Sequence, residues 1–162
     1  MKSRLEGLPH ETLVGVFFRC VSKKHAKKPF DVSGSLARGG RFNPPNEFAA
    51  LYLSDSEETC RNEVGRRNPL AKDSDYPVFP AQIEIYGVLD LTNDKSRKKL
   101  FLRHDDDLVK NDYLNTQALA KAARSAGYKA ILTLSATGKG KNLIIFTDML
   151  DATDKVMPIG PL

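Results

Sequence analysis

One stretch, residues 39–64, constrains this chain more than any other, because it places a turn, a strand and a helix start in immediate succession. It reads GGRFNPPNEFAALYLSDSEETCRNEV. The glycine pair frees the backbone to turn or to approach a ligand closely. The Asn-Pro-Pro-Asn sequence predicts a turn, since proline cannot donate to a central strand ladder. The stretch also holds three chemically active side chains, Arg41, Tyr52 and Glu63.

The apolar run at residues 49–53 predicts a short buried strand. Successive side chains of a strand point to opposite faces, so Leu51 and Leu53 face one way and Tyr52 faces the other. The sequence therefore predicts that Tyr52 points away from the apolar packing of its two neighbours.

A helix is predicted directly after this strand. Ser54 is the expected N-cap, with Glu57 three residues later. On such a helix Cys60, Glu63 and Val64 share one face, because residues three and four positions apart are neighbours. Glu63 is therefore expected to point inward.

A carboxylate on a buried face is costly unless it is paired or hydrogen-bonded. Arg41 and Tyr52 are the candidate partners of Glu63. Spacing alone leaves two interpretations open: a structural ion pair between Glu63 and Arg41, or a carboxylate that belongs to a functional site.

Composition indicates one domain over residues 1–162, with 41% hydrophobic and 28% charged residues. No apolar run approaches the roughly 18 residues that a membrane span needs. The first residues lack the apolar stretch of a signal peptide. The two cysteines, Cys20 and Cys60, give neither a disulfide framework nor metal-ligand spacing. We expect a reduced, cytoplasmic protein without a bound metal.

The formal net charge of +5 favours anionic partners. The segment 23–28 holds four lysines. Together with Arg41 they could contact phosphates, so an alternative hypothesis is that the chain is a nucleic-acid-binding module. No aromatic residues interleave this segment for base stacking. That alternative also leaves the inward Glu63 unexplained, so direct binding to nucleic acid is the less favoured hypothesis.

Residues 13–21 are rich in β-branched and aromatic side chains and predict a strand. Arg19 shares a face of it with Phe17 and Val21. An arginine on an apolar face either binds a fixed anion or extends to the edge of the sheet, and both interpretations remain open.

The remaining segments predict an α+β fold with mainly antiparallel pairing, because strands and helices do not alternate strictly. The expected segments are a polar loop at 22–36, a half-exposed strand at 78–91, a helix at 111–127, strands at 128–134 and 142–148 joined by a loop at 135–141, and an irregular tail at 156–162.

Four segments in this order resemble the RES family, the toxins of RES–Xre type II toxin–antitoxin systems. They are FFRC, GGRFNPP, ALYLSDSEETCRNEV and YKAILTLSATGKGKNLIIF, and the resemblance covers a core of about residues 14–148. It implies an ADP-ribosyltransferase-like fold, with two small, mainly antiparallel sheets around an NAD cleft and helices flanking them.

The resemblance also implies an activity. RES proteins break the nicotinamide–ribose bond of NAD⁺ by hydrolysis or with inorganic phosphate, and some are described as ADP-ribosyltransferases that modify a protein. NAD⁺ is then a substrate, and no cofactor is expected. The implied partner is an Xre-like antitoxin, and a homo-oligomer stays open.

Carried over to this sequence, the family's arginine matches Arg19 or Arg41, its glutamate Glu63, its serine Ser135 and its tyrosine Tyr52. Glu63 is expected to stabilise the positive charge that develops on the ribose. The two arginines are expected to bind the diphosphate with their planar forks. Tyr52 is expected to stack on the nicotinamide or ribose, and Ser135 to hydrogen-bond at the same end of NAD⁺.

Overall fold

A computed structural model describes residues 1–102, 106–110 and 112–160. The strands of this part of the chain are β1 (Glu11–Cys20), β2 (Leu51–Ser54), β3 (Val78–Asp90), β4 (Ala130–Leu134), β5 (Lys141–Ile145) and β6 (Lys155–Pro158). The α-helices are α1 (Lys2–Leu5), α2 (Ser33–Arg38), α3 (Glu57–Arg67), α4 (Asp94–Lys99), α5 (Asp106–Val109) and α6 (Leu114–Ser125). Short 3₁₀ turns lie at Lys23–His25, Asp73–Asp75 and Thr147–Met149.

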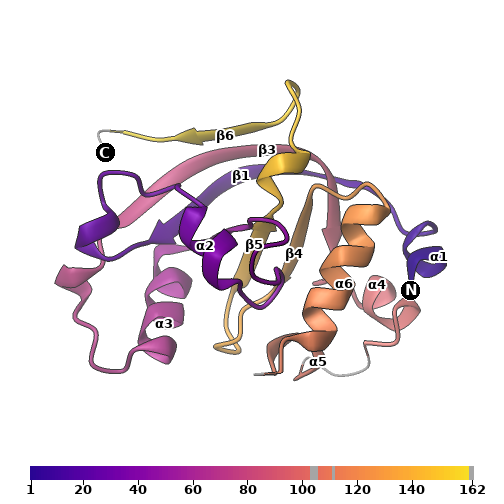
Figure 1. The fold of residues 1–162 in the computed structure, drawn as a ribbon, viewed down its shortest axis with the longest axis horizontal. Coiled ribbons are helices and arrows are strands. Elements are labelled where there is room, and N and C mark those ends of the chain that lie inside the picture. Colours follow the sequence, from indigo (N-terminus) through magenta and orange to yellow (C-terminus); the bar gives the residue numbers. More distant parts are fainter. Residues whose placement is uncertain (103–105, 111, 161–162) are drawn as a thin grey trace.

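The strands form one sheet in the order β1-β2-β5-β4-β3-β6, and β1 also pairs with β3. This extra pairing closes the sheet into a barrel-like shape (Figure 1). The pair β3–β4 is parallel and the other pairs are antiparallel. A mixed, mainly antiparallel α+β fold is therefore confirmed, but the expected two small sheets are not what the structure shows.

The length of β3 explains the single sheet. Its 13 residues pair with β1 along most of their length, while the end at Val88–Asp90 pairs with β4. The segment Ala81–Glu84 also pairs with β6. One long strand thus joins elements that the family resemblance would divide between two sheets.

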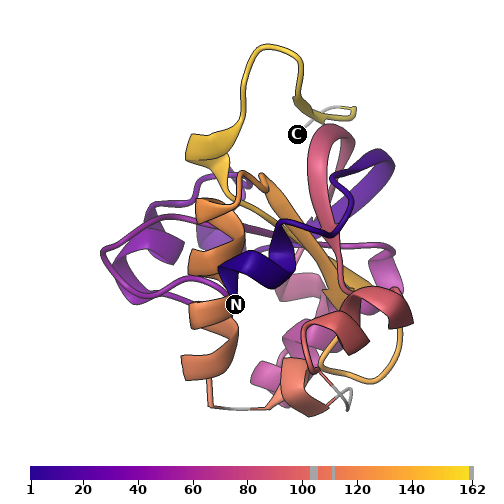
Figure 2. The same ribbon diagram turned by 90° about the vertical axis from the view of Figure 1, so that its right-hand side faces the viewer.

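Two hydrophobic clusters fill the molecule on opposite sides of the strands. The first lies inside the closed sheet and consists of Phe17, Leu51, Leu53, Ala81, Ile83, Ile85, Val88, Ala130, Leu132, Leu143 and Ile145. The second lies between the sheet and the helices, where the small residues Ala120 and Ala123 let α6 pack closely. Helix α1 lies against α6 on this side (Figure 2).

The boundary between β2 and α3 differs from the prediction. Ser54 ends β2, where it pairs with Phe18 and Asn142, so it cannot cap the helix. Ser56 is the N-cap, and its hydroxyl accepts a hydrogen bond from the Thr59 amide at 3.0 Å. The strand continues further than the apolar run indicated, because sheet pairing and not hydrophobicity sets its end.

Other boundaries also differ. The polar loop at 22–36 contains the start of α2, and the tail forms β6 instead of being irregular. Helix α6 begins at Leu114. The predicted helix start, Asn111, lies outside the described residues. The strand at 78–91 is confirmed as half-exposed: Ile83 and Ile85 are buried, whereas Tyr86 is exposed.

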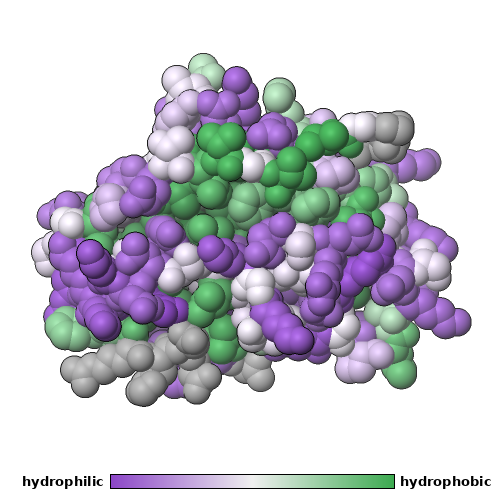
Figure 3. Space-filling view, turned by 180° about the vertical axis from the view of Figure 1, so that it is seen from behind, coloured by the Kyte–Doolittle hydropathy of each residue, from purple (hydrophilic) through white to green (hydrophobic). Residues whose placement is uncertain are grey.

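Apolar side chains remain on the surface. Seen from behind, they gather in the upper part of the molecule, above a mainly polar lower part (Figure 3). The exposed apolar residues of the strands include Val14 and Val16 on β1 and Met157 on β6. The outward alternation of Val14 and Val16 follows from the pleat of β1.

Among the described residues, no helix has the length and apolarity that a membrane span requires. Cys20 and Cys60 are free thiols. No group of three or more potential metal ligands is found in residues 1–102, 106–110 and 112–160.

Tyr128 connects the N-terminus to this core. Its fully buried hydroxyl lies 3.0 Å from the carbonyl oxygens of both Leu5 and Leu8. We expect Tyr128→Phe to lower the free energy of unfolding by about 1–3 kcal/mol, because buried acceptors lose their donor. Chemical denaturation measures the change. Tyr86→Phe, which removes an exposed hydroxyl that donates to Glu84, is the control; equal losses in the two variants would contradict this account.

Candidate functional site

The glycine pair and the residues after it form a tight turn. The amide of Gly40 donates to the carbonyl of Asn43 at 2.8 Å, and the two residues form an isolated β-bridge. Gly39 has φ +70°, in the left-handed region that favours glycine. Arg41 and Phe42 lie at the tip, with Phe42 buried in the core. The turn thus fixes the backbone from which Arg41 extends.

Asn43 and Tyr52 hold this turn in place. The fully buried Asn43 donates from Nδ2 to the carbonyls of Ser35 and Phe48. The Tyr52 hydroxyl donates to Asn43 Oδ1 at 2.8 Å and accepts from the Phe42 amide at 2.9 Å. Burial raises the pKa of Tyr52 above its ordinary value. Its hydroxyl therefore supports the turn, while its ring borders the cavity described below.

Arg41 is held at one end only. Its Nη1 donates to the carbonyls of Leu108 and Lys110, and its guanidinium lies 5.0 Å from the ring centre of Tyr113. Its Nη2 is buried and has no hydrogen-bond partner among the described residues. Burial lowers the pKa of Arg41 from its ordinary value. One donor of a partly desolvated cation is thus left without an acceptor in the described part of the chain.

Glu63 is the central carboxylate of the site. It extends from α3, and its side chain is only 14% exposed, as the helical pattern predicted. Its Oε1 accepts three hydrogen bonds: from Ser135 Oγ at 2.6 Å, from the Ala136 amide at 3.1 Å and from Asn142 Nδ2 at 2.7 Å. Three donors on one oxygen fix the orientation of the whole carboxylate.

The other oxygen, Oε2, has a looser environment. Its recorded partner is Arg66 Nε at 3.9 Å, one turn along α3. Neither Arg41 nor Tyr52, the partners expected from the sequence, forms a hydrogen bond or ion pair with Glu63 within the described residues. The proposed structural pair between Glu63 and Arg41 is therefore not formed, and Oε2 is available to a ligand.

Ser135 reaches the site from the start of the β4–β5 loop. It is buried, and besides Glu63 its Oγ lies 2.7 Å from Thr137 Oγ1. It does not border the cavity, although Ala136 and Asn142 do. This geometry makes Ser135 a positioning residue for Glu63.

Arg19 lies near the end of β1 and borders the same cavity as Glu63. Its Nη1 donates to the carbonyls of Pro29 at 2.8 Å and Asp31 at 3.0 Å. Burial lowers the pKa of Arg19, and the charge of the nearby Arg67 acts in the same direction. These contacts attach the end of β1 to the loop that follows it, so Arg19 is fixed at the wall of the cleft.

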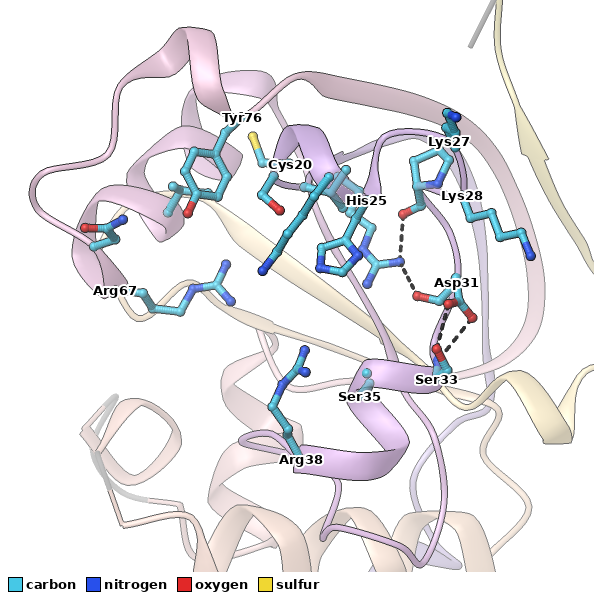
Figure 4. A pocket seen from close by; sticks show the side chains of 18 residues that line it. Cys20, His25, Lys27, Lys28, Asp31, Ser33, Ser35, Arg38, Arg67 and Tyr76 are labelled. Atoms are coloured by element: carbon cyan, nitrogen blue, oxygen red, sulfur yellow. Dashed lines mark hydrogen bonds between the residues drawn. The ribbon is translucent and has the colours of Figure 1, made fainter.

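The side chains of Arg19, Arg41, Tyr52 and Glu63 border one cavity of about 390 Å³. A second cavity of about 720 Å³ adjoins it, and the two share Arg19, Arg38 and Arg67 in their walls. In the larger cavity the side chains of Arg67 and Arg38 extend toward its centre, from the left and from below in the view of Figure 4. Together the two cavities form one continuous cleft.

The cleft is strongly cationic. Among the described residues, its walls include two carboxylates, Glu63 and Asp31. The lysine and arginine residues in the walls are Arg19, Lys24, Lys27, Lys28, Arg38, Arg41, Arg66 and Arg67. Such an excess favours a ligand that carries phosphate groups.

The sequence analysis missed several of these residues. Arg66 and Arg67 follow Glu63 by three and four positions, so helical spacing could have placed them beside it. Asn142 gave no local signal, because it meets Glu63 only through the pairing of β5 with β2 and β4.

The closed mixed sheet and the arginine-lined cleft define a class: a mixed α/β protein with a cationic cleft beside a fixed carboxylate. A family model described as the RES domain matches residues 16–162. This chain belongs to the RES domain family.

Curated relatives are similar over much of the chain. NAD(+) phosphorylase MbcT, from Mycobacterium bovis and Mycobacterium tuberculosis, is 34% identical over 118 residues, which span 67% of this chain and 63% of that protein. A second M. tuberculosis protein, named a probable NAD(+) phosphorylase, is 30% identical over 150 residues, which span 88% of this chain and 69% of its own length.

Among solved structures, the crystal structure of the M. tuberculosis MbcT–MbcA toxin–antitoxin complex has the same fold, with a TM-score of 0.80 and 24% sequence identity. The superposition covers 98% of this chain and 88% of that one.

The contact between Gly40 and Tyr52 gives a test of the turn. A methyl group on Gly40 would lie 2.6 Å from the Tyr52 hydroxyl and 3.0 Å from Asn43 Oδ1. We expect Gly40→Ala to lower the free energy of unfolding by about 1–3 kcal/mol through overpacking. Denaturant titration followed by circular dichroism measures this.

Gly65→Ala is the matched control, because Gly65 lies in α3 with no atom within 4 Å of the added methyl group. It should raise the free energy of unfolding by about 0.4–1 kcal/mol. Destabilisation of similar size in both variants would show that the Tyr52 contact is not the cause.

Proposed function

We propose that this protein degrades NAD⁺ by cleaving its nicotinamide–ribose bond with inorganic phosphate. The observation that carries the proposal is the Glu63 carboxylate, which is fixed through its Oε1 and belongs to a residue that borders an arginine-lined cavity. Cleavage of this bond builds positive charge on the ribose, and a carboxylate beside the ribose stabilises that charge.

The relatives support this choice among the possible reactions. Two of them are named as NAD(+) phosphorylase or probable NAD(+) phosphorylase. Since the match spans only 63% of MbcT, the transfer of that activity to this chain belongs to the proposal. We also propose that this chain has an ADP-ribosyltransferase-like fold, with which the mixed sheet beside the cleft is compatible.

The proposed reaction balances as follows. An oxygen of phosphate forms a bond to the anomeric carbon of the nicotinamide ribose, while the bond from that carbon to the pyridinium nitrogen breaks. The bonding electron pair goes to the ring nitrogen, which releases neutral nicotinamide. The second product is ADP-ribose with a phosphate on its anomeric carbon. Water in place of phosphate would give free ADP-ribose.

The residues singled out from the sequence take definite roles in this proposal. Glu63 stabilises the charge on the ribose, and Arg19 binds the diphosphate from the wall shared by the two cavities. Arg41 presents its unpartnered Nη2 to a phosphate group. Tyr52 borders the smaller cavity, and its ring is assigned to the nicotinamide ribose in this proposal. Ser135 acts through Glu63, which it orients.

The setting that we propose is a cytoplasmic toxin controlled by an Xre-like antitoxin. The solved structure similar to this chain is a toxin–antitoxin complex, which supports a protein partner. A partner with acidic side chains over the cleft would complement its arginines and lysines and exclude the substrate.

Product analysis tests the reaction. Purified protein is incubated with NAD⁺, with and without phosphate, and the products are identified by mass. We expect nicotinamide and phosphorylated ADP-ribose when phosphate is present. Free ADP-ribose in both conditions would indicate hydrolysis, label from NAD⁺ fixed on protein would indicate ADP-ribosyl transfer, and absence of nicotinamide release would refute NAD⁺ cleavage.

Glu63→Gln tests the carboxylate. The amide keeps the shape of the side chain but removes its charge, so we expect kcat for nicotinamide release to fall by roughly 100-fold or more. Glu58→Gln is the control, since Glu58 is exposed on the same helix and does not border the cleft. Retained activity in Glu63→Gln, with a folded protein by circular dichroism, would remove Glu63 from the mechanism.

A further inference from the structure

We propose that inorganic phosphate, the second substrate, binds between Arg41 and Arg66, next to Oε2 of Glu63. This inference rests on the proposed function and assigns a site to the attacking group. The diphosphate of NAD⁺ is then held by Arg19 and Arg67, which line both cavities.

Arg66 is the first observation. It extends from α3, and its Nε lies 3.9 Å from Glu63 Oε2, too far for a hydrogen bond. Its side chain is 32% exposed, and within residues 1–102, 106–110 and 112–160 its guanidinium makes no hydrogen bond. Arg66 borders the smaller cavity with Glu63 but not the larger one. Apart from this loose ion pair with Glu63, its planar fork can bind an anion there.

Arg41 is the second and independent observation. Arg41 borders the same cavity, and its Nη2 is buried and has no hydrogen-bond partner in the described part of the chain. A buried donor without an acceptor costs free energy, and the cost is larger for a charged group. An oxyanion in the cavity would supply the missing acceptor.

The two guanidiniums also repel each other. The charge of Arg66 lowers the pKa of Arg41 further, in addition to the larger effect of burial, while Tyr113 and Glu63 act in the opposite direction. Two cations held close together on one wall are stabilised by a shared dianion. Inorganic phosphate has both the charge and the three or more acceptor oxygens to bridge them.

The other arginine pair is less suited to the attacking phosphate. Arg19 and Arg67 line both cavities, so they face the chamber of about 720 Å³ that has room for the ADP portion of NAD⁺. The cavity of about 390 Å³ has Glu63 in its wall, which places a phosphate there beside the bond to be broken.

The site predicts a specific kinetic defect. Arg66→Gln should raise the KM for phosphate by roughly 10-fold, the loss expected for charge-assisted hydrogen bonds, while the KM for NAD⁺ changes by less than about twofold. Because water can still react, the products should shift from phosphorylated ADP-ribose toward free ADP-ribose. A residue that only orients Glu63 would instead lower kcat with phosphate and with water alike.

Arg61→Gln is the matched control. Arg61 lies on the same helix, pairs with Glu57 at 2.9 Å and does not border either cavity. It should keep the wild-type KM for phosphate and the wild-type ratio of products. An equal phosphate KM in Arg66→Gln and Arg61→Gln, or a selective rise in the KM for NAD⁺, would overturn the assignment.

A binding measurement separates this site from the proposed reaction. Phosphate that binds the folded protein raises the midpoint of thermal unfolding. We expect the shift caused by phosphate to be smaller in Arg66→Gln than in wild type and Arg61→Gln, whether or not NAD⁺ is cleaved. The same shift in all three proteins would refute the phosphate site, whereas a smaller shift in Arg66→Gln without NAD⁺ cleavage would refute only the reaction.

Discussion

The site depends on one interaction, the acceptance of three hydrogen bonds by Oε1 of Glu63. A carboxylate in a largely enclosed position is costly unless donors replace the water that it loses. Here the donors come from the β4–β5 loop and from the second residue of β5, Asn142, while the carboxylate comes from α3. The interaction therefore fixes the acid and, at the same time, attaches the helix to the closed sheet.

Two arginines of the cleft are held in place by backbone carbonyls and not by carboxylates. Arg19 and Arg41 each use one nitrogen to bind backbone carbonyls, which holds the guanidinium in place. Neither forms an ion pair with a carboxylate of the described residues. Fixed cations of this kind attract phosphate groups without needing to reorganise when the ligand arrives. The same positive charge makes the cleft a natural target for an acidic partner.

Sequence reasoning succeeded where the signal was local. The alternation around Ile83 and the opposite facing of Tyr52 follow from the strand pleat, and the inward direction of Glu63 follows from helical spacing. It failed at the cap of α3, because the end of β2 is set by pairing with distant strands. It also failed for the tail, since β6 forms only where β3 offers an open edge.

The sequence by itself determined the family, the residue types of the site and the helix face that carries Glu63. Only the tertiary structure decided that the strands close into one sheet, and that Ser135, Ala136 and Asn142 meet Glu63 across 72, 73 and 79 positions of the chain. The physical reason is that helical and strand periodicities encode which face a side chain occupies. They do not encode which distant backbone will pair with it, because that choice is made by the packing of the whole core.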